Sequence, residues 1–503
     1  MEEKKDSAWQ DAVLSFFNKN FNLLLIGVLF FALILRLKYL TINQAVWFDE
    51  AEYLSAAKNW AFGYPPYELH YVRPAILPFI MSILYKIGAS EITFRTLILI
   101  FSLIGVLFTY LVGKELFDKK VALIAAFISS SFYVYLFYTA RIMTDIPSAA
   151  LWMVSLWFFW KGYVLKESRK YLWLFGFFLV IATLTRFPAG ILLLVILLFL
   201  LVTEKLKFLK NKDLWISSAV AIITLLPYSL WYYFRYNKLP ILGAAGFYQS
   251  VNYFSTYLKL LPNVTLSPIP GISEIFPLLG NYLFLLFLAG FLIIILNLIM
   301  GVDFISKDQK LRNFFFIFLW ILIPLFYFSF FAGQVPEDRY LIYIYPAIFY
   351  LVGFALIKFY NILRDYNSLL GIIVVIFILI SISLAQIKYA DNIIKIKSSS
   401  YVEFKYAGTW IKENSFRDEK VIASGIPQLS YYSERRILPW PEEEKFKEMI
   451  QDESIKYIVL SRLEGSPEWS YQWPEKNKDK IAPVQAYLDS QQRPIVIVYE
   501  IIR

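Results

Sequence analysis

The sequence contains no cysteine and a single histidine, His70, among its 503 residues. The absence of cysteine excludes disulfide bonds, thiol catalysis and cysteine-ligated metal sites. One histidine also excludes a metal site with several histidine ligands. No cofactor is predicted with certainty: a divalent metal stays open, with Glu68 and His70 as weak candidate ligands.

Charged residues are scarce as well, at 17%, whereas hydrophobic residues make up 58% of the chain and aromatic residues 19%. This composition, with repeated apolar runs near twenty residues, is typical of a polytopic membrane protein. The formal net charge of +10 does not indicate a nucleic-acid partner. Its lysines cluster in short loops between apolar runs, where the positive-inside rule places them.

The apolar runs predict about eleven transmembrane helices. The predicted spans are Phe21–Leu40, Thr96–Gly113, Val121–Thr139, Ile146–Tyr163, Tyr171–Thr185, Ala189–Val202, Leu214–Phe234, Leu278–Met300, Phe314–Phe331, Leu341–Lys358 and Leu370–Leu384. The first is interpreted as a retained anchor, because its core is too long for a signal peptide. Pro74–Gly88 is apolar but short, which favours an interfacial or re-entrant helix.

The basic clusters fall on alternate loops, and a cytoplasmic N-terminus places all of them inside the cell. The outward loops are then 41–95, 140–145, 186–188, 235–276 and 332–340, together with the C-terminal segment. We therefore expect a multi-pass protein of the cell membrane with an extracytoplasmic C-terminal domain.

From about residue 390 the composition becomes that of a soluble protein, so the predicted domains are 1–389 and 390–503. Hydrophobic periodicity in the second predicts a small α/β domain. The expected helices are Val402–Asn414, Glu442–Gln451 and Val484–Ser490, and the expected strands are Lys420–Ser424, Lys456–Ser461 and Pro494–Ile501.

The stretch 45–53, Ala-Val-Trp-Phe-Asp-Glu-Ala-Glu-Tyr, places three carboxylates at the mouth of the first span. Ionisable groups are costly at such a depth and are functional candidates by default. Arginines share the outward loops, and arginine binds phosphate bidentately without losing its charge. A carboxylate can deprotonate an attacking hydroxyl. Sugar transfer from a lipid phosphate needs one such base and no acid, because the phosphate leaves as an anion.

Four motifs carry a family resemblance: Trp47-Phe48-Asp49-Glu50-Ala51-x-Tyr53, Arg73-Pro74, Arg141-x-x-Thr144-Asp145-x-Pro147 and Asp338-Arg339-Tyr340-x-x-x-x-Tyr345-Pro346. In order and spacing, over roughly residues 20–360, the chain resembles the membrane glycosyltransferases of the GT-C type, in the protein O-mannosyltransferase and aminoarabinose transferase superfamily. The resemblance implies an inverting transfer of a sugar from dolichyl or undecaprenyl phosphate to an acceptor hydroxyl at the outer membrane face.

The resemblance also implies roles for individual residues. Asp49 is expected to be the catalytic base and Asp145 the second essential acid, and Arg73 stands where the family often has a lysine that reaches the donor phosphate. The other expected phosphate contacts are Arg141, Arg339 and Tyr340, and Glu50 and Tyr53 are expected to contact the acceptor or to be structural.

The expected partners are a polyprenyl-phosphate-linked sugar, membrane lipids and a glycan, lipid or protein acceptor. Val72 replaces the glutamate usual in aminoarabinose transferases, which argues against their lipid A substrate. The C-terminal segment shows no match to the β-trefoil of eukaryotic protein mannosyltransferases, so it gives no support to a protein acceptor either.

Structural interpretations stand beside these roles. Asp49 followed by Glu52 fits a helix capping box. Glu50 is equally consistent with an acceptor contact and with an ion pair. Asp145 also suits a helix N-terminus, because Pro147 follows in the first turn.

Two arginines have similar alternatives. Arg339 can pair with the adjacent Glu337 and Asp338 or extend its charged head to the membrane interface. Arg186, just before Pro188, is interpreted as an interface anchor.

A transporter or flippase of a lipid-linked saccharide is the alternative function. Transporters place charged binding groups near the bilayer midplane, whereas here the acidic residues gather at one face. A receptor or scaffold that presents the C-terminal domain leaves the acidic and arginine-bearing loops unexplained.

Overall fold

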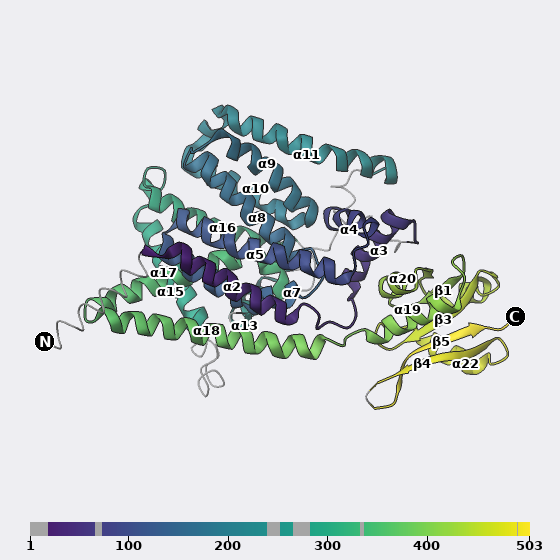
Figure 1. Cartoon of the computed structure of the whole chain (residues 1–503). Helices are drawn as coiled ribbons and strands as arrows, with labels where there is room; N and C mark the ends of the chain where they lie inside the picture. The colour runs from purple at the N-terminus through teal and green to yellow at the C-terminus, as the bar shows by residue number, and fades with distance from the viewer. Residues whose placement is uncertain (1–18, 66–72, 239–251, 265–281, 332–335, 490) are drawn as a thin grey trace. The chain divides into compact units, whose positions relative to one another are not determined.

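The computed structural model describes residues 19–65, 73–238, 252–264, 282–331, 336–489 and 491–503 (Figure 1). Contacts divide the chain into two compact units. The first comprises Met1–Leu40, Thr96–Ala140 and Thr144–Ile393, and the second comprises Thr41–Arg95, Arg141–Met143 and Ile394–Arg503. The loop 41–95, which the sequence division grouped with the spans, thus belongs with the C-terminal segment.

The first unit is helical. Its elements are α2 (Phe21–Tyr39), most of α5 (Glu91–Leu116), α6 (Lys119–Ser131), α7 (Tyr133–Thr139), α8 (Asp145–Phe159), α9 (Arg169–Thr185), α10 (Ile191–Glu204), α11 (Lys212–Tyr236), α13 (Phe254–Val264), α15 (Tyr282–Met300), α16 (Gln309–Phe330), α17 (Tyr345–Arg364) and most of α18 (Ser368–Lys397). A helix occupies every predicted span.

Within the described residues, eight helices are long and apolar enough to cross a membrane, or nine if the bent pair α6 and α7 counts as one span. This is fewer than the eleven predicted spans. The difference lies in α8, which gives way after 15 residues to a π-helical turn at Trp160–Val164, and in α9, which has 17 residues.

The helices of this unit pack closely and expose apolar side chains on their outer faces. A side chain at Gly290 of α15 would lie 2.3 Å from the carbonyl oxygen of Leu351 in α17, so only glycine permits this approach. On α11, Ile222, Ile223 and Phe234 are 65%, 67% and 81% exposed. Such apolar surface on helices of spanning length is that of a multi-pass membrane protein.

The second unit joins helices α3 (Phe48–Phe62) and α4 (Ile76–Lys86) to a five-stranded sheet. The strands are β1 (Lys420–Ala423), β2 (Arg436–Leu438), β3 (Ile455–Ser461), β4 (Ile481–Leu488) and β5 (Pro494–Ile501), in the order β2-β1-β3-β5-β4. Strands β2, β1 and β3 are parallel, whereas β5 is antiparallel to both β3 and β4.

Alternation along the strands places one hydrophobic core on each face of the sheet. Val421 and Ala423 of β1 pack with α19 (Val402–Asn414) and α20 (Ile426–Ser433). Ile422, between them, packs with α21 (Glu443–Met449) and α22 (Glu468–Lys476) on the other face. The unit therefore contains a layered α/β domain, as the sequence predicted.

Most of the C-terminal elements were predicted, but the described part of the predicted helix Val484–Ser490, residues 484–489, is not helical. Its first residues belong to β4, which pairs with β5, and the backbone N–H of Asp489 donates to the carbonyl oxygen of Arg493 at 2.9 Å. Cross-strand pairing overrides the local helical pattern of this short segment. The short elements α20, β2 and α22 were not predicted.

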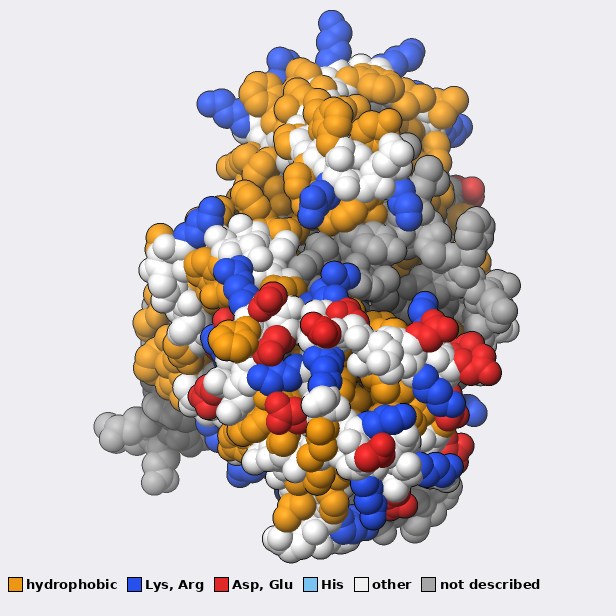
Figure 2. Space-filling view, turned by 90° about the vertical axis from the view of Figure 1, so that its right-hand side faces the viewer, with side chains coloured by type: hydrophobic (Ala, Val, Ile, Leu, Met, Phe, Trp, Pro, Cys, Tyr) orange, Lys and Arg blue, Asp and Glu red, His pale blue; other side chains and the backbone are white. Residues whose placement is uncertain are grey.

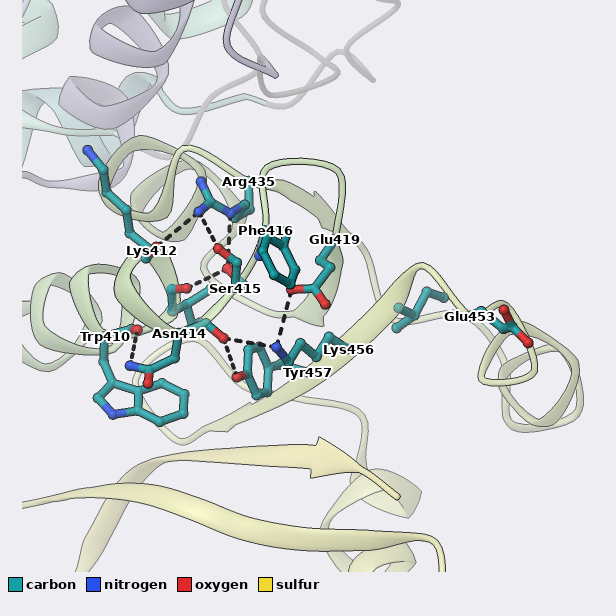
Figure 3. Close-up of polar contacts among 12 residues, drawn as sticks. Trp410, Lys412, Asn414, Ser415, Phe416, Glu419, Arg435, Glu453, Lys456 and Tyr457 are labelled. Atoms are coloured by element: carbon teal, nitrogen blue, oxygen red, sulfur yellow. Dashed lines mark hydrogen bonds and ion pairs between the residues drawn. The ribbon is translucent and has the colours of Figure 1, made fainter. Parts of the chain in front are cut away.

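Arg435 fixes the end of α19 to the segment that follows α20 (Figure 3). Its guanidinium, in a side chain only 8% exposed, donates to the carbonyl oxygens of Lys412 and Ser415 at 2.9 and 2.7 Å. These carbonyls lie at the C-terminal end of the helix, where intrahelical partners run out.

Figure 2 shows that acidic and basic side chains are interspersed on one region of the visible face, so no single-sign patch covers that region.

Candidate active site

Helix α3 carries the three carboxylates of the motif, and its first turn explains their different environments. Trp47 is the residue before the helix, in extended conformation, and its backbone N–H donates to Glu50 Oε2 at 2.9 Å. Glu50 therefore supplies the capping carboxylate. The predicted capping box of Asp49 with Glu52 does not form. A capping residue precedes its helix, whereas α3 begins at Phe48 and so already contains Asp49.

Glu50 also forms a buried ion pair with Arg141. The two side chains are 0% and 1% exposed, and Arg141 Nη1 lies 3.3 Å from Glu50 Oε2. The other oxygen of Glu50 accepts from the backbone N–H of Ile142 at 2.7 Å. Arg141 also lies over the ring of Trp47 at 3.8 Å and donates to the carbonyl oxygen of Lys397 at 3.0 Å. This network fixes the segment 141–142 against the start of α3.

Asp49 and Glu52 share a different cation, Arg73. Nη2 of Arg73 lies 3.0 Å from Asp49 Oδ1 and also pairs with Glu52. The side chains of Asp49 and Arg73 are 20% and 32% exposed, whereas that of Glu52 is 3% exposed. Asp49 is thus the most exposed of the three acidic side chains of the motif.

Burial raises the pKa of Glu52 to about 7, because removal from water disfavours the carboxylate. Arg73 opposes this shift and the charge of Asp49 adds to it. The pKa of Arg73 is raised: burial lowers it, but Tyr53, Glu52 and Asp49 favour the charged form more strongly. Tyr53, four residues after Asp49 and 3% exposed, completes this group.

A second group of charged residues lies in the first unit, around Asp145. Asp145 opens α8 and is 0% exposed, and Arg186 Nη1 is 3.1 Å from its Oδ1. Its Oδ2 is buried and has no hydrogen-bond partner among the described residues. Arg186, which we expected at the membrane interface, is 13% exposed and serves as the partner of Asp145. Its guanidinium also lies 5.6 Å from the ring centroid of Tyr340.

The motif around Tyr340 is held by tyrosines. The carboxylate of Asp338 accepts from the hydroxyls of Tyr133 and Tyr138 at 2.8 and 3.0 Å. The hydroxyl of Tyr345 donates to the backbone oxygen of Asp338 at 2.5 Å. Arg339 pairs with Glu337 at 2.8 Å and lies 5.4 Å from the ring centroid of Tyr340.

The predicted site residues thus form two groups. Asp49, Glu50, Tyr53, Arg73 and Arg141 belong to the second unit, and Asp145, Arg339 and Tyr340 to the first. Glu68 and His70 lie outside the described residues. In the part of the chain that the structure describes, no group of three or more histidine and acidic residues is arranged to hold a metal.

Sequence reasoning missed two partnerships. Glu52 is one of the three motif carboxylates and a predicted capping residue, but its pairing with Arg73, which it shares with Asp49, was not predicted. Glu52 lies three residues after Asp49, so the two side chains share one face of a helix. This spacing could have predicted that they share a partner. The pairing of Arg186 with Asp145 joins the end of α9 to the start of α8, and these segments are too far apart in the sequence for local spacing to predict the pair.

Comparisons with known proteins agree with this architecture. The sequence profile of the family described as dolichyl-phosphate-mannose-protein mannosyltransferase matches residues 72–231. No curated protein sequence matches the chain.

Solved structures match at low identity over most of the chain. The structure of ArnT from Cupriavidus metallidurans bound to undecaprenyl phosphate is 14% identical, with a TM-score of 0.63 over 95% of this chain and 97% of that one. The apo oligosaccharyltransferase of Archaeoglobus fulgidus is 15% identical, with a TM-score of 0.63 over 89% and 70%. AglB from the same organism, in complex with an inhibitory peptide and a dolichol-phosphate, is 15% identical, with a TM-score of 0.61 over 88% and 69%.

Proposed function

We propose that this chain, whose fold is that of the GT-C membrane glycosyltransferases, moves a sugar from a polyprenyl phosphate to an acceptor hydroxyl, with inversion, at the outer face of the membrane. The observation that carries the proposal is the group formed by Asp49, Glu52 and Arg73. It combines a carboxylate that reaches solvent with a cation suited to phosphate.

The environments of the three carboxylates favour Asp49 as the base. Glu50 is fully buried and its oxygens are occupied by Arg141 and two backbone N–H groups. Glu52 is nearly buried and its pKa is raised to about 7, so a large fraction of it is protonated at neutral pH. Asp49 is 20% exposed and paired with a guanidinium, and this arrangement suits the removal of a proton from an acceptor hydroxyl.

Arg73 is well placed to hold the donor phosphate. Only its Nη2 takes part in the ion pairs with Asp49 and Glu52. The other N–H groups of its planar fork have no partner among the described residues, so they remain for phosphate oxygens. A phosphate held there leaves as an anion that the guanidinium stabilises, and the reaction needs no general acid.

Arg141 and the Asp145 group have different proposed tasks. Arg141 is 1% exposed and engaged on several sides, so we assign it to positioning Glu50 and the start of α3. Asp145, with a buried oxygen that lacks a hydrogen-bond partner among the described residues, stays the second proposed acid. Arg339 and Tyr340 stay proposed phosphate contacts.

The structural neighbours support the donor class. Two of them are complexes with a polyprenyl phosphate, one with undecaprenyl phosphate and one with dolichol-phosphate. The basic loops between the spans support a reaction at the outer face. If these loops lie in the cytoplasm, as the positive-inside rule predicts, the loop 41–95 that contains α3 lies outside it.

Mass spectrometry of surface glycans and glycolipids tests this function. A deletion strain is compared with the same strain carrying either the wild-type chain or the Asp49→Asn variant. We expect one glycoconjugate to lack a sugar in the deletion strain and in the variant, and to regain it with the wild-type chain. Unchanged glycoconjugates in all strains would contradict the proposal.

A further inference from the structure

The α/β domain of the second unit contains a cleft at the end of its parallel strands. Its volume is about 390 Å³, within the range of roughly 300–1,000 Å³ usual for small-molecule sites. The lining residues are Phe48, Ala423, Ser424, Gly425, Ile426, Pro439, Trp440, Gly465, Ser466 and Pro467. They come from the segments that follow β1, β2 and β3, and from the first residue of α3.

The position of this cleft follows from the topology of the sheet. The chain leaves β1 through α20, which packs on one face, and leaves β3 through α22, which packs on the other. Strands β1 and β3 are parallel neighbours. In open α/β sheets, ligands bind beyond the carboxyl ends of neighbouring strands whose connections diverge in this way.

The lining has the chemistry of a site for a neutral sugar ring. It offers two aromatic side chains, Phe48 and Trp440, and two hydroxyls, Ser424 and Ser466, and it contains no charged residue. An aromatic face packs against the C–H face of a pyranose, while hydroxyls and backbone groups bond its O–H groups. The Ser424 hydroxyl donates to the Gly465 carbonyl oxygen at 3.1 Å, which leaves its lone pairs to accept from a ligand.

Two further features point to a ligand. A Cβ built on Gly465 meets nothing within 4 Å, so packing does not require glycine there and the backbone is open to a bound molecule. The indole Nε1–H of Trp440 is buried and has no hydrogen-bond partner among the described residues. An unpaired buried donor is costly, so the Trp440 indole lacks a partner that a small side-chain shift toward a ligand hydroxyl would supply.

We infer that this cleft is the acceptor subsite of the enzyme and that the acceptor is a saccharide whose neutral ring packs against Phe48 and Trp440. This inference rests on the proposed function, because it assigns the sugar in the cleft to the acceptor. Phe48 directly precedes Asp49 at the start of α3, so the same helical turn contributes a lining residue of the cleft and the proposed base.

A peptide acceptor fits these observations less well. Peptides are usually held along an exposed sheet edge or in an elongated groove. This cleft lies at the end of the parallel strands instead. Its lining also contains no charged residue, which argues against a phosphorylated acceptor group.

Binding to a glycan array tests the inference without turnover. The full-length Asp49→Asn protein, purified in detergent, is applied to an array of several hundred defined glycans and to a matched array of peptides. We expect binding to a subset of glycans. The variant Gly465→Leu, which adds a bulky side chain at a lining position where a Cβ meets no neighbour, should reduce this binding at least tenfold, whereas Gly465→Ala should reduce it only slightly.

Phe416→Ala is the matched control, because it removes a 74% exposed aromatic side chain of the same domain that does not line the cleft. It should leave glycan binding unchanged, and thermal unfolding should show all variants folded. The inference is overturned if no glycan binds, if Gly465→Leu binds as well as its parent, or if only peptides show binding that depends on Gly465. The array measures binding and not turnover. The acceptor subsite and the catalytic role of Asp49 can therefore fail independently: Asp49→Asn can lose sugar transfer and still bind glycans.

Discussion

Arg73 and Asp49 form an ion pair of 3.0 Å although they lie 24 residues apart in the sequence. The same guanidinium also pairs with Glu52, one helical turn further along α3. One cation therefore holds two carboxylates of different burial and keeps Asp49 at the solvent-accessible side of the pair.

Replacement of Arg73 tests its role toward the donor. Arg73→Ala removes a charged contact to phosphate, which typically contributes about 1.5–3 kcal/mol, so polyprenyl phosphate should bind roughly ten- to a hundredfold more weakly. Arg73→Lys should retain part of the affinity because it keeps the charge. Titration of purified protein with polyprenyl phosphate measures both, and unchanged affinity in Arg73→Ala would exclude the contact.

The raised pKa of Glu52 predicts a specific dependence of stability on pH. Its pKa rises from 4.5 in the unfolded chain to about 7 in the folded one, mainly through burial. The folded state thus keeps this proton longer, and the stabilising contribution, full below pH 4.5, is lost as pH rises through 7. The shift corresponds to at most about 3 kcal/mol.

Glu52→Gln should therefore show a flatter fall of Tm between pH 4.5 and 7.5 than the wild type. The difference between the two proteins cancels the contributions of other titrating groups, such as Glu434, whose pKa is lowered by Lys412 and Lys58. Parallel Tm curves for the two proteins would show that Glu52 does not titrate in this range.

The buried pair of Glu50 and Arg141 should be important for stability. Glu50→Ala leaves the 1% exposed Arg141 charge without its carboxylate, and breaking such a pair costs about 3–5 kcal/mol. Glu443→Ala is the control, because it removes an exposed pair with Lys447 worth no more than about 0.5 kcal/mol. Thermal unfolding of both variants checks this, and equal losses would contradict the structural role of Glu50.

The pairing of Arg186 with Asp145 can be tested by a double-mutant cycle of transfer rates. Arg186→Leu leaves a buried carboxylate without its partner, and Asp145→Asn removes the charge that needed it. We expect the two effects to be coupled by about 0.5–3 kcal/mol, as for residues in contact. Additive effects would show that the two side chains act independently.

The overall fold was largely predictable because long apolar runs indicate membrane spans, and every predicted span contains a helix. The core strands β1, β3 and β5 were found from short apolar runs. Segment 484–488 was assigned to a helix because its short local pattern does not reveal pairing with β5. The short elements α20 and β2 depend on tertiary packing that no local pattern encodes.

The sequence motifs select the candidate site residues, but they do not predict how these residues pair. The basic loops predict an outward location for Asp49 and Arg73, and their motifs single them out as candidates. That Glu50 caps α3 and binds Arg141 depends on where the helix begins, and helix ends are the least certain feature of a sequence-based assignment. Arg186 contacts Asp145 and the preceding residue, Thr144, across more than forty residues of sequence. No local pattern predicts a contact over such a separation.

Asp49 is proposed to take the proton of the acceptor hydroxyl, and the turnover of Asp49→Asn measures this role. Asparagine keeps the shape of aspartate and most of its hydrogen-bonding capacity, so the protein should fold and bind polyprenyl phosphate as the wild type does. Its rate of sugar transfer, measured with a labelled polyprenyl-phosphate sugar, should fall by roughly two to four orders of magnitude. Near-normal transfer by a well-folded Asp49→Asn protein would contradict the account and leave Asp145 as the candidate base.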